Sequence, residues 1–412
     1  MNPGRYVLPI LGLAVAVATT ATTPAPAPAP SPKIVVSGRV RVYNFTRSYR
    51  TGTIDTQATS IALKLHLETA PRDGLGAGLT YYSANPFSNG AIVPNELESS
   101  LPGVALNTLA EIYAQYRSRG TLVRIGRQTL QTPFANPADS RTILVTYEGI
   151  GLTQALPRQW TLSAYRIDRV KNRTVATFTP TSFVTATPTG GFAALGLARA
   201  SKRGTFQAWV YRFDRLSSLL YADGSTTLAL SHGWRAAASA QFATENGLSN
   251  SVLGPISGHL YGARVVAGAR NLEFGLAYDR VPDVPGAYKR GALLSPYTFG
   301  DNSDPLYTTL IGASLVEKAG PGQAYVLSST FTSDDKRFKG ILARGRFDLL
   351  TTLAAPKNEM YETDFDVAYD LLRPKSPTDP HGLWFHERYF AQDTTVKPYT
   401  YQQSRLFLDY TW

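Results

Sequence analysis

The end of the chain constrains its fold more than any other stretch. Residues 404–412 read S-R-L-F-L-D-Y-T-W, and a strand would place alternate side chains on opposite faces. One face would be apolar with an aromatic end: Leu406, Leu408, Tyr410 and Trp412. The other face would be mostly polar: Arg405, Phe407, Asp409 and Thr411. Because a sheet strand packed on a soluble core shows the same pattern, this segment alone leaves both a soluble and a membrane-spanning strand open.

Other segments repeat the alternation with more charge on one face. In the segment 361–371, Glu362, Asp364, Asp366 and Asp370 alternate with apolar or hydroxyl side chains. The segments 61–68, 111–117 and 341–348 are similar. A membrane barrel accommodates both faces, because lipid covers the apolar face and water fills the lumen. An open sheet would leave the backbone groups of its edges unpaired in hydrocarbon. The pattern therefore predicts an all-β, transmembrane antiparallel barrel.

Composition narrows the function classes. The 412 residues include no Cys, which excludes a disulfide framework and thiolate metal sites. The net charge is +11, but Lys and Arg are interspersed with Asp and Glu and form no nucleic-acid-binding motif. Beyond the N-terminus no apolar run reaches the roughly 20 residues of a spanning helix, whereas a spanning strand needs only about 10. Because no nucleic-acid-binding motif is present, nucleic acid is not an expected partner.

The N-terminal residues differ from the rest of the chain. Arg5, an apolar stretch and the small-residue pattern around Ala16 and Ala18 predict a cleaved signal peptide at residues 1–18. Residues 19–33 contain alternating Pro and Ala, which favours an extended spacer. Contact of this spacer with peptidoglycan stays open. The barrel domain would then comprise residues 34–412, exported to the bacterial outer membrane.

The connections between the strand-like segments are alternately short and long, as in outer-membrane barrels. Counting the segments predicts 18 strands, with residues 307–315 assigned to a long loop and 372–381 placed on the short-turn side. Arg127 and Glu387 fall on faces otherwise expected to contact lipid, so they belong at a rim or the register differs there. The expected long connections are 48–57, 84–108, 131–145, 170–191, 215–224, 245–258, 281–322, 349–359 and 392–402.

No pattern indicates an enzyme. The five His residues show no metal-ligand spacing, and the chain lacks a G-x-S-x-G nucleophile motif. No metal and no cofactor are expected.

Several patches resemble the OprD family of substrate-selective outer-membrane porins. The first is G-R-Q at residues 126–128, followed by Pro133, the triplet Asp139-Ser140-Arg141 and T-Y-E-G at 146–149. The others are R-V-R-V-Y-N-F at 39–45, S-L-L-Y-A-D at 218–223, D-P-L-Y-T at 304–308 and E-T-D-F-D at 362–366. Their order and spacing cover nearly the whole chain after the spacer. The chain ends on Trp412, where the family usually has Phe.

The resemblance implies an 18-stranded barrel, a homotrimer, and two long loops that fold inward to narrow the pore. It places a constriction at Asp139, Ser140 and Arg141, and it implies a ladder of basic residues that guides solutes bearing carboxylates. Parity assigns nine basic residues to the lumen: Arg39, Arg41, Lys64, Arg124, Arg264, Arg344, Arg346, Arg388 and Arg405. Parity also assigns an acidic wall opposite the ladder: Glu362, Asp364 and Asp366. Opposite charges on facing walls would create a transverse field.

Each of these charges has a second interpretation, because lumen charges in any barrel also pair with one another. Asp139 and Arg141 would then pin a loop to the wall. At the level of function, the favoured hypothesis is passive, selective diffusion of small hydrophilic solutes that carry a carboxylate, such as organic acids, amino acids or peptides. The alternatives are a general diffusion porin, and a structural or adhesion barrel whose Tyr-rich loop binds a partner.

Overall fold

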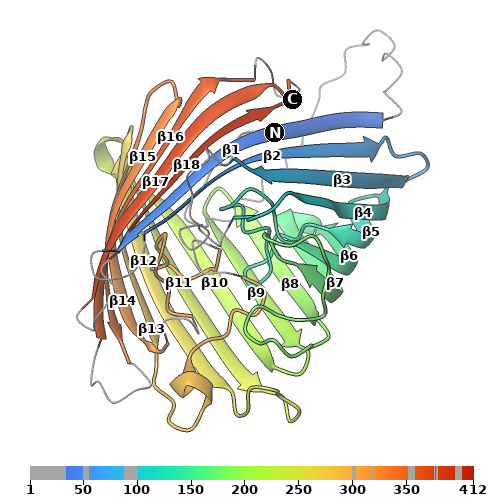
Figure 1. Ribbon diagram of the computed structural model, residues 1–412. Coiled ribbons are helices and arrows are strands. Elements are labelled where there is room, and N and C mark those ends of the chain that lie inside the picture. Colours follow the sequence, from blue (N-terminus) through green and yellow to red (C-terminus); the bar gives the residue numbers. More distant parts are fainter. Residues whose placement is uncertain are drawn as a thin grey trace.

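The chain forms a closed antiparallel β-barrel. The computed structural model describes residues 34–49, 55–87, 101–298, 303–316, 320–350, 358–374, 376, 379–394 and 401–412. Each of the 18 strands pairs with its neighbours in sequence, and β1 pairs with β18 to close the ring (Figure 1). The predicted fold class and strand number are confirmed.

The strands are β1 (Ile34–Tyr49), β2 (Thr56–Thr69), β3 (Leu75–Pro86), β4 (Leu106–Ser118), β5 (Thr121–Gln128), β6 (Thr146–Leu156), β7 (Trp160–Lys171), β8 (Phe192–Ser201), β9 (Gly204–Phe213), β10 (Ser217–Ala229), β11 (Trp234–Gly247), β12 (Ser257–Ala269), β13 (Leu272–Val281), β14 (Gly322–Thr332), β15 (Phe338–Leu349), β16 (Asn358–Leu372), β17 (Gly382–Thr394) and β18 (Tyr401–Thr411). The part of the chain that the structure describes also contains three short 3₁₀ turns: η2 (Pro157–Gln159), η3 (Ser231–Gly233) and η4 (Tyr288–Gly291). Within the described residues, no helix is both long and apolar enough to cross a membrane.

The two ends of the barrel differ, as the connections predict. The connections that follow even-numbered strands lie at one end, which we call the turn end, and most of them are short. The connections that follow odd-numbered strands lie at the other end, which we call the loop end, and most of them are long. The connection between β16 and β17 comprises residues 373–381 and lies at the turn end, where 372–381 was expected, and residues 307–315 lie in a loop, as expected. The predicted long connection 215–224 is wrong, because β10 already begins at Ser217. The predicted signal peptide and spacer lie outside the described residues.

The last strand shows the predicted two faces. Phe407 and Asp409 point inward with 1% and 0% of their surface exposed, whereas Leu406, Leu408 and Tyr410 are exposed on the outer face. The two charged residues predicted to break the lipid-facing pattern do lie on the outer face. Glu387 accepts a hydrogen bond of 2.6 Å from the Ser404 hydroxyl on β18, and Arg127 pairs with Glu148 near the loop end.

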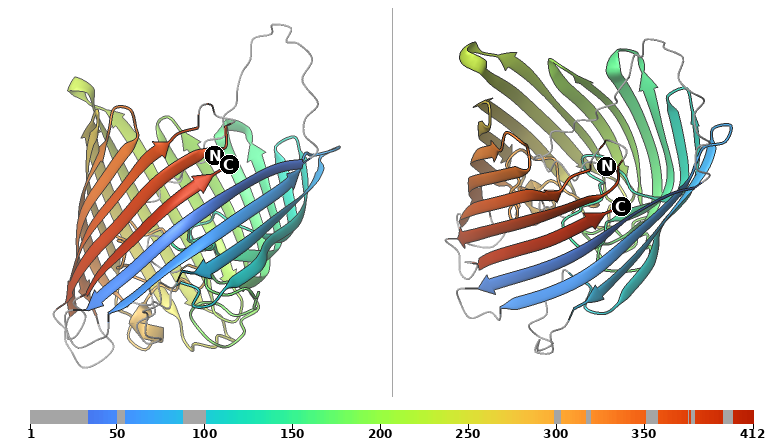
Figure 2. Two further views of the ribbon diagram at one scale, coloured as in Figure 1. Left: turned by 45° about the horizontal axis from the view of Figure 1, so that its top comes forward. Right: turned by 90° about the horizontal axis from the view of Figure 1, so that it is seen from above.

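Two long connections fold into the ring of strands (Figure 2). We call residues 129–145 the first inner loop, and the described residues 282–298, 303–316 and 320–321 the second inner loop. Buried residues of both loops, for example Phe134, Tyr297 and Leu310, belong to the main hydrophobic cluster. The inward side chains of β6–β15 complete this cluster. The loop-side half of the lumen is therefore packed like a protein core. The inward faces of strands are apolar there, which a simple rule of apolar outside and polar inside does not anticipate.

Strand β15 illustrates the consequence. Ala343, Gly345 and Phe347 are buried and point inward, whereas Arg344 and Arg346 are exposed on the outer face. A Cβ added to Gly345 would lie 2.5 Å from Leu310 of the second inner loop. The assignment of Arg344 and Arg346 to the lumen ladder is thus wrong. Small and apolar residues occupy the inner face because a loop, not water, lies against it.

Candidate functional site: the lumen

The first inner loop crosses the lumen and is fastened to β1 by Asp139. Arg39 donates from Nη1 to Asp139 Oδ2 at 2.9 Å, and Arg41 donates from Nη1 to Asp139 Oδ1 at 2.7 Å. Burial alone would raise the pKa of the Asp139 carboxyl. The two guanidinium groups outweigh burial and hold this pKa well below its ordinary value. Asp139 is therefore a charged anchor at every pH near neutrality.

Arg41 joins the anchor to the closing seam of the barrel. Its Nε and Nη2 donate to the two oxygens of Asp409, its register partner on β18, at 2.7 Å each. Its Nη1 also donates to the Arg141 carbonyl at 2.6 Å, and only 1% of its surface is exposed. This bidentate, buried geometry makes Arg41 a structural brace with its donors already engaged.

Further basic side chains gather at Phe45 on β1, against which the same loop lies. Three guanidinium groups surround the ring of Phe45, those of Arg47, Arg141 and Arg405, with their Cζ atoms 5.5, 4.7 and 5.5 Å from its centroid. The Tyr43 hydroxyl donates to the Ser140 carbonyl at 2.9 Å. The predicted constriction triplet thus lies against β1, and all three of its residues pin the first inner loop to the barrel wall.

The second inner loop is held by carboxylates that accept hydrogen bonds from its backbone. Glu362 accepts from Gly312 N at 2.7 Å, and Asp364 accepts from Ile311 N at 2.8 Å. Two carboxylates that the sequence reasoning missed do the same, Asp279 from Thr308 N at 2.7 Å and Glu245 from Leu294 N at 2.8 Å. Their signal was present in the sequence, because an acid amid inward apolar residues needs a donor.

The approach at Gly312 is so close that only glycine fits without rearrangement. A Cβ there would lie 2.5 Å from the Phe390 ring and 3.0 Å from Glu362 Oε2. Glu362 is 0% exposed and also accepts a hydrogen bond from Gln392 Nε2 at 2.8 Å. The β16 carboxylates therefore clamp a loop.

The predicted acidic wall does share one inward face, but it does not stand opposite the ladder. Asp366 accepts hydrogen bonds from Arg388 at 3.0 Å and lies 2.6 Å from His386 Nε2, both on the adjacent strand β17. The expected field between facing walls is corrected accordingly. Asp366 is thus paired with a cation on the adjacent strand, whereas Glu362 and Asp364 accept hydrogen bonds from amides. A buried carboxylate without a partner would be costly.

The two inner loops contact each other beside β6. The Tyr147 hydroxyl lies 2.9 Å from the Asn136 carbonyl and 3.0 Å from the Tyr297 carbonyl, so it can bridge one loop to the other. Ala135 and Tyr297 also form an isolated parallel bridge. The two loops are therefore joined to each other as well as to the barrel wall.

The turn-side half is polar along β2–β5. Arg124 Nε donates to Gln115 Oε1 at 3.0 Å, and Gln115 Nε2 donates to Glu68 Oε1 at 2.6 Å. The Arg124 guanidinium also lies over the Tyr113 ring, 4.4 Å from its centroid. Lys64 faces inward on β2, close enough to Arg39 and Glu111 to interact with their charges. The predicted lumen positions of Lys64 and Arg124 are as expected.

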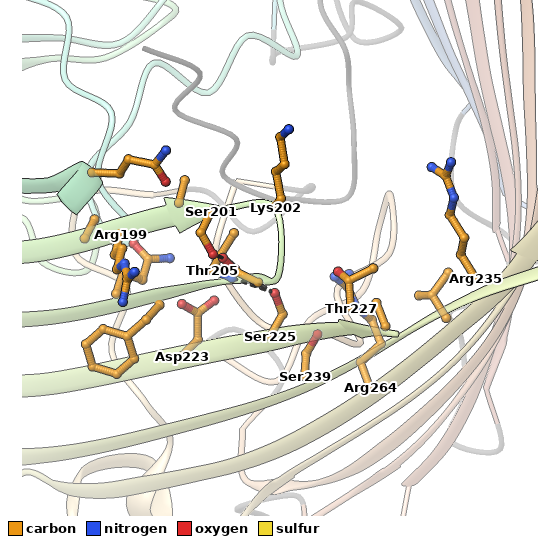
Figure 3. Close-up of a pocket in the computed structure, with 18 of the residues that line it drawn as sticks. Arg199, Ser201, Lys202, Thr205, Asp223, Ser225, Thr227, Arg235, Ser239 and Arg264 are labelled. Atoms are coloured by element: carbon orange, nitrogen blue, oxygen red, sulfur yellow. Dashed lines mark hydrogen bonds between the residues drawn. The ribbon is translucent and has the colours of Figure 1, made fainter. Parts of the chain in front are cut away.

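On the other side, β7–β13 line a cavity of about 1300 Å³ (Figure 3). Arg264 projects into it, its guanidinium 5.0 Å from the ring of Tyr307 on the second inner loop. Arg235 lies one strand away on β11, and Asp223 faces the same space from β10. Thr205 and Ser225 hydroxyls are hydrogen-bonded at 2.7 Å on its wall. Within the described part of the chain, neither Arg235 nor Arg264 forms an ion pair.

Sequence reasoning placed Arg264 in the lumen but missed most of this cavity. Arg235 shares the parity of Gln241 and Glu245, so alternation along β11 could have identified it. The rim residues Arg158, Lys202 and Arg270 lie in or beside tight turns, where alternation carries no information. Arg199, labelled in Figure 3, belongs to the outer face of β8, and its guanidinium lies 5.7 Å from the Trp160 ring. Among the described residues, no group of three or more acidic, His or Cys side chains is placed to hold a metal.

Comparison with known proteins agrees with this architecture. The family model described as outer membrane porin, OprD family, matches residues 89–292. No curated protein matches the chain by sequence.

Among solved structures, OccK9 (OpdG) of Pseudomonas aeruginosa is similar with a TM-score of 0.78 and 16% identity, covering 92% of this chain and 98% of that one. OpdK of Pseudomonas aeruginosa with vanillate has a TM-score of 0.74 and 16% identity, covering 92% and 98%. OccK2 (OpdF) of the same organism, in complex with glucuronate, has a TM-score of 0.74 and 14% identity, covering 92% and 97%. At these identities the likeness to solved structures shows the fold.

The family model covers the inward-folded first loop and the strands that line the cavity, and the solved porins share the closed 18-stranded ring. The chain therefore belongs to the OprD family of porins, the substrate-specific channels of the bacterial outer membrane.

Proposed function

We propose that this porin admits small hydrophilic solutes that carry a carboxylate, such as organic acids, amino acids or peptides, by passive diffusion. The observation that carries the proposal is the charge of the open half of the lumen. The cavity is lined by more basic than acidic side chains, and Arg235 and Arg264 have no carboxylate partner among the described residues. The basic set is Arg158, Lys202, Arg235, Arg264 and Arg270, and the acidic set is Asp223 and Glu273.

Chemistry favours a carboxylate over a simple halide as the recognised group. A guanidinium presents parallel N–H donors that match the two oxygens of a carboxylate. The low-dielectric walls around a basic cavity concentrate anions and raise their rate of entry. The complexes of similar barrels with vanillate and with glucuronate support this proposal, since both molecules carry a carboxylate.

In this proposal the first inner loop, held by Arg39, sets the aperture at Asp139, Ser140 and Arg141. Lys64 on β2 and Arg124 on β5 attract anions toward it. Arg41, Arg388 and Arg405 act differently from a ladder of contacts, because they are buried and hold the barrel and loops together. We also propose a homotrimer, on the family resemblance alone, which native mass spectrometry of the purified protein would check.

Planar-bilayer recording of the refolded protein tests the function. Small discrete conductance steps that organic acids block, and that glycerol of similar size does not, are the expected result. Large steps indifferent to every solute would instead indicate a general diffusion porin. Absence of steps from a barrel shown to be folded by its gel mobility would favour a structural or adhesion role.

A further inference from the structure

A cluster of arginines and tyrosines lies on the outer face of the barrel, away from the lumen and toward the loop end. It spans β13–β16, and we call it the outer patch: Tyr278, Arg280, Tyr325, Arg344, Arg346 and Tyr361. The permeation path does not use these residues, because the inward neighbours of each one face the packed loops.

Three tyrosines of the outer patch lie in one row across the strands. Tyr278 is the register partner of Tyr325, and Arg346 pairs with Tyr325 on one side and with Tyr361 on the other. The Tyr278 and Tyr325 rings are 4.9 Å apart. Such a row marks the level where hydrocarbon meets the lipid head groups.

Arg344 lies one row deeper than the tyrosines, among residues that face hydrocarbon. Its register partner is Leu327, which is 62% exposed, and Leu342 follows on the same face with 52% exposed. Its guanidinium turns back to the Tyr361 ring, 5.4 Å from the centroid, and donates to the Thr363 hydroxyl. Among the described residues it forms no ion pair. A cation here needs an anion, since charge on the lipid face is destabilising.

The neighbouring charges differ in their partners. Arg346 is neutralised by Asp348 at 2.8 Å and Glu359 at 3.1 Å. Arg280, the next-to-last residue of β13, is exposed and has no ion pair within the described chain. Outward arginines of the described strands favour this end of the barrel. Arg199 alone lies toward the turn end, and the others are Arg127, Arg166, Arg169, Arg212, Arg280, Arg344 and Arg346.

We propose that the outer patch binds the phosphate of a lipid head group in the outer leaflet, with Arg344 as its ligand. A guanidinium fork suits phosphate oxygens, and the exposed leucines below would lie along the acyl chains. A protein interface accounts less well for Arg344, since a buried cation against a second barrel would require a carboxylate there. The inference is independent of which solute passes through the lumen.

Binding of lipopolysaccharide to the purified full-length barrel in detergent tests the proposal, with native mass spectrometry as the readout. The variants are Arg344→Ala and Arg344→Lys. Arg199→Ala is the matched control, because Arg199 is also an outward arginine beside an aromatic ring but lies at the opposite end. Three probes separate the sources of phosphate: lipopolysaccharide, the same lipid after dephosphorylation, and inorganic phosphate.

We expect Arg344→Ala to weaken lipopolysaccharide binding by about tenfold or more, as for loss of a hydrogen bond between charged groups. Arg344→Lys should lose less, and Arg199→Ala should bind like the parent protein. The proposal is wrong if Arg344→Ala binds as tightly as the parent, if dephosphorylated lipid binds equally well, or if inorganic phosphate displaces the lipid. A smaller oligomer for Arg344→Ala without lipid would identify a protomer interface instead. Heat-dependent gel mobility checks that each variant is folded. If Arg344→Ala fails to fold, the binding of lipopolysaccharide by Arg344→Lys is compared with that of the parent instead.

Discussion

Two groups of arginines in the lumen look alike in the sequence and differ in the structure. At the closing seam, Arg41 is 1% exposed and shared between Asp409, Asp139 and a backbone carbonyl. In the turn-side cavity, Arg235 and Arg264 face open space and have no carboxylate partner among the described residues. The basic residues of this lumen are therefore not one ladder: the donors of Arg41 are engaged by the protein, whereas Arg235 and Arg264 retain donors for a solute.

The difference follows from where the inner loops lie. A buried guanidinium loses its hydrogen bonds to water and needs protein acceptors in their place. An arginine beneath a loop therefore acquires partners in the protein. An arginine beside water keeps its hydration and can exchange it for a passing carboxylate. The two groups should therefore respond to mutation in opposite ways, stability in the first and selectivity in the second.

The largest expected effect is on the seam. Arg41→Ala leaves the fully buried Asp409 without its bidentate partner and releases one of the two guanidinium groups that hold Asp139. Breaking a buried pair in this way costs about 3–5 kcal/mol of stability. Urea unfolding of the barrel in lipid vesicles measures this loss. Arg264→Ala is the control and should change stability by less than about 0.5 kcal/mol; equal stability losses in both variants would remove the distinction between the two groups.

The loop clamp should come next. Glu362→Ala leaves the Gly312 N–H and the Gln392 amide without their acceptor, at a cost of about 1–3 kcal/mol. A loosened second inner loop should make single-channel currents larger and noisier. Glu362→Gln keeps an acceptor oxygen of the same reach and should resemble the parent channel. If both variants record like the parent, the carboxylate does not hold the loop.

A smaller effect on selectivity, with no effect on stability, is expected in the cavity. Arg264→Ala removes a charge that would interact with a bound anion by about 1 kcal/mol in a well-hydrated site, close to a fivefold change in occupancy. The reversal potential in a salt gradient should shift toward cations, and block by organic acids should weaken. Arg264→Lys retains the charge and loses the fork, so it should restore the reversal potential but not the block. A parent-like block in Arg264→Lys would show that charge alone is recognised.

The sequence predicted the ring of strands well, because alternation is a local property that a membrane barrel enforces on every strand. It predicted less about the interior. Parity places Arg344 and Arg346 on one face but cannot say which face meets water, and here a loop covers the inner one. The same limit applies to Glu362 and Asp364, whose inward position was predicted and whose partners on the second inner loop were not. Long-range contacts of loops depend on tertiary packing that no local pattern encodes.

The smallest expected effect concerns pH and the anchor of the first inner loop. The pKa of Asp139 is lowered in the folded barrel, so its contribution to loop anchoring is complete above the ordinary Asp value of about 3.9 and is lost only as pH falls through the lower folded value. Block of the channel by an acid that stays ionised, such as a sulfonate, should therefore be constant between pH 7 and pH 4. Asp139→Asn should show at every pH the wider, weakly blocked state that the parent reaches only in stronger acid. A parent channel that already widens between pH 6 and pH 4 would mean that Arg39 and Arg41 do not hold this carboxylate, and that the first group of arginines is less firmly braced than its geometry indicates.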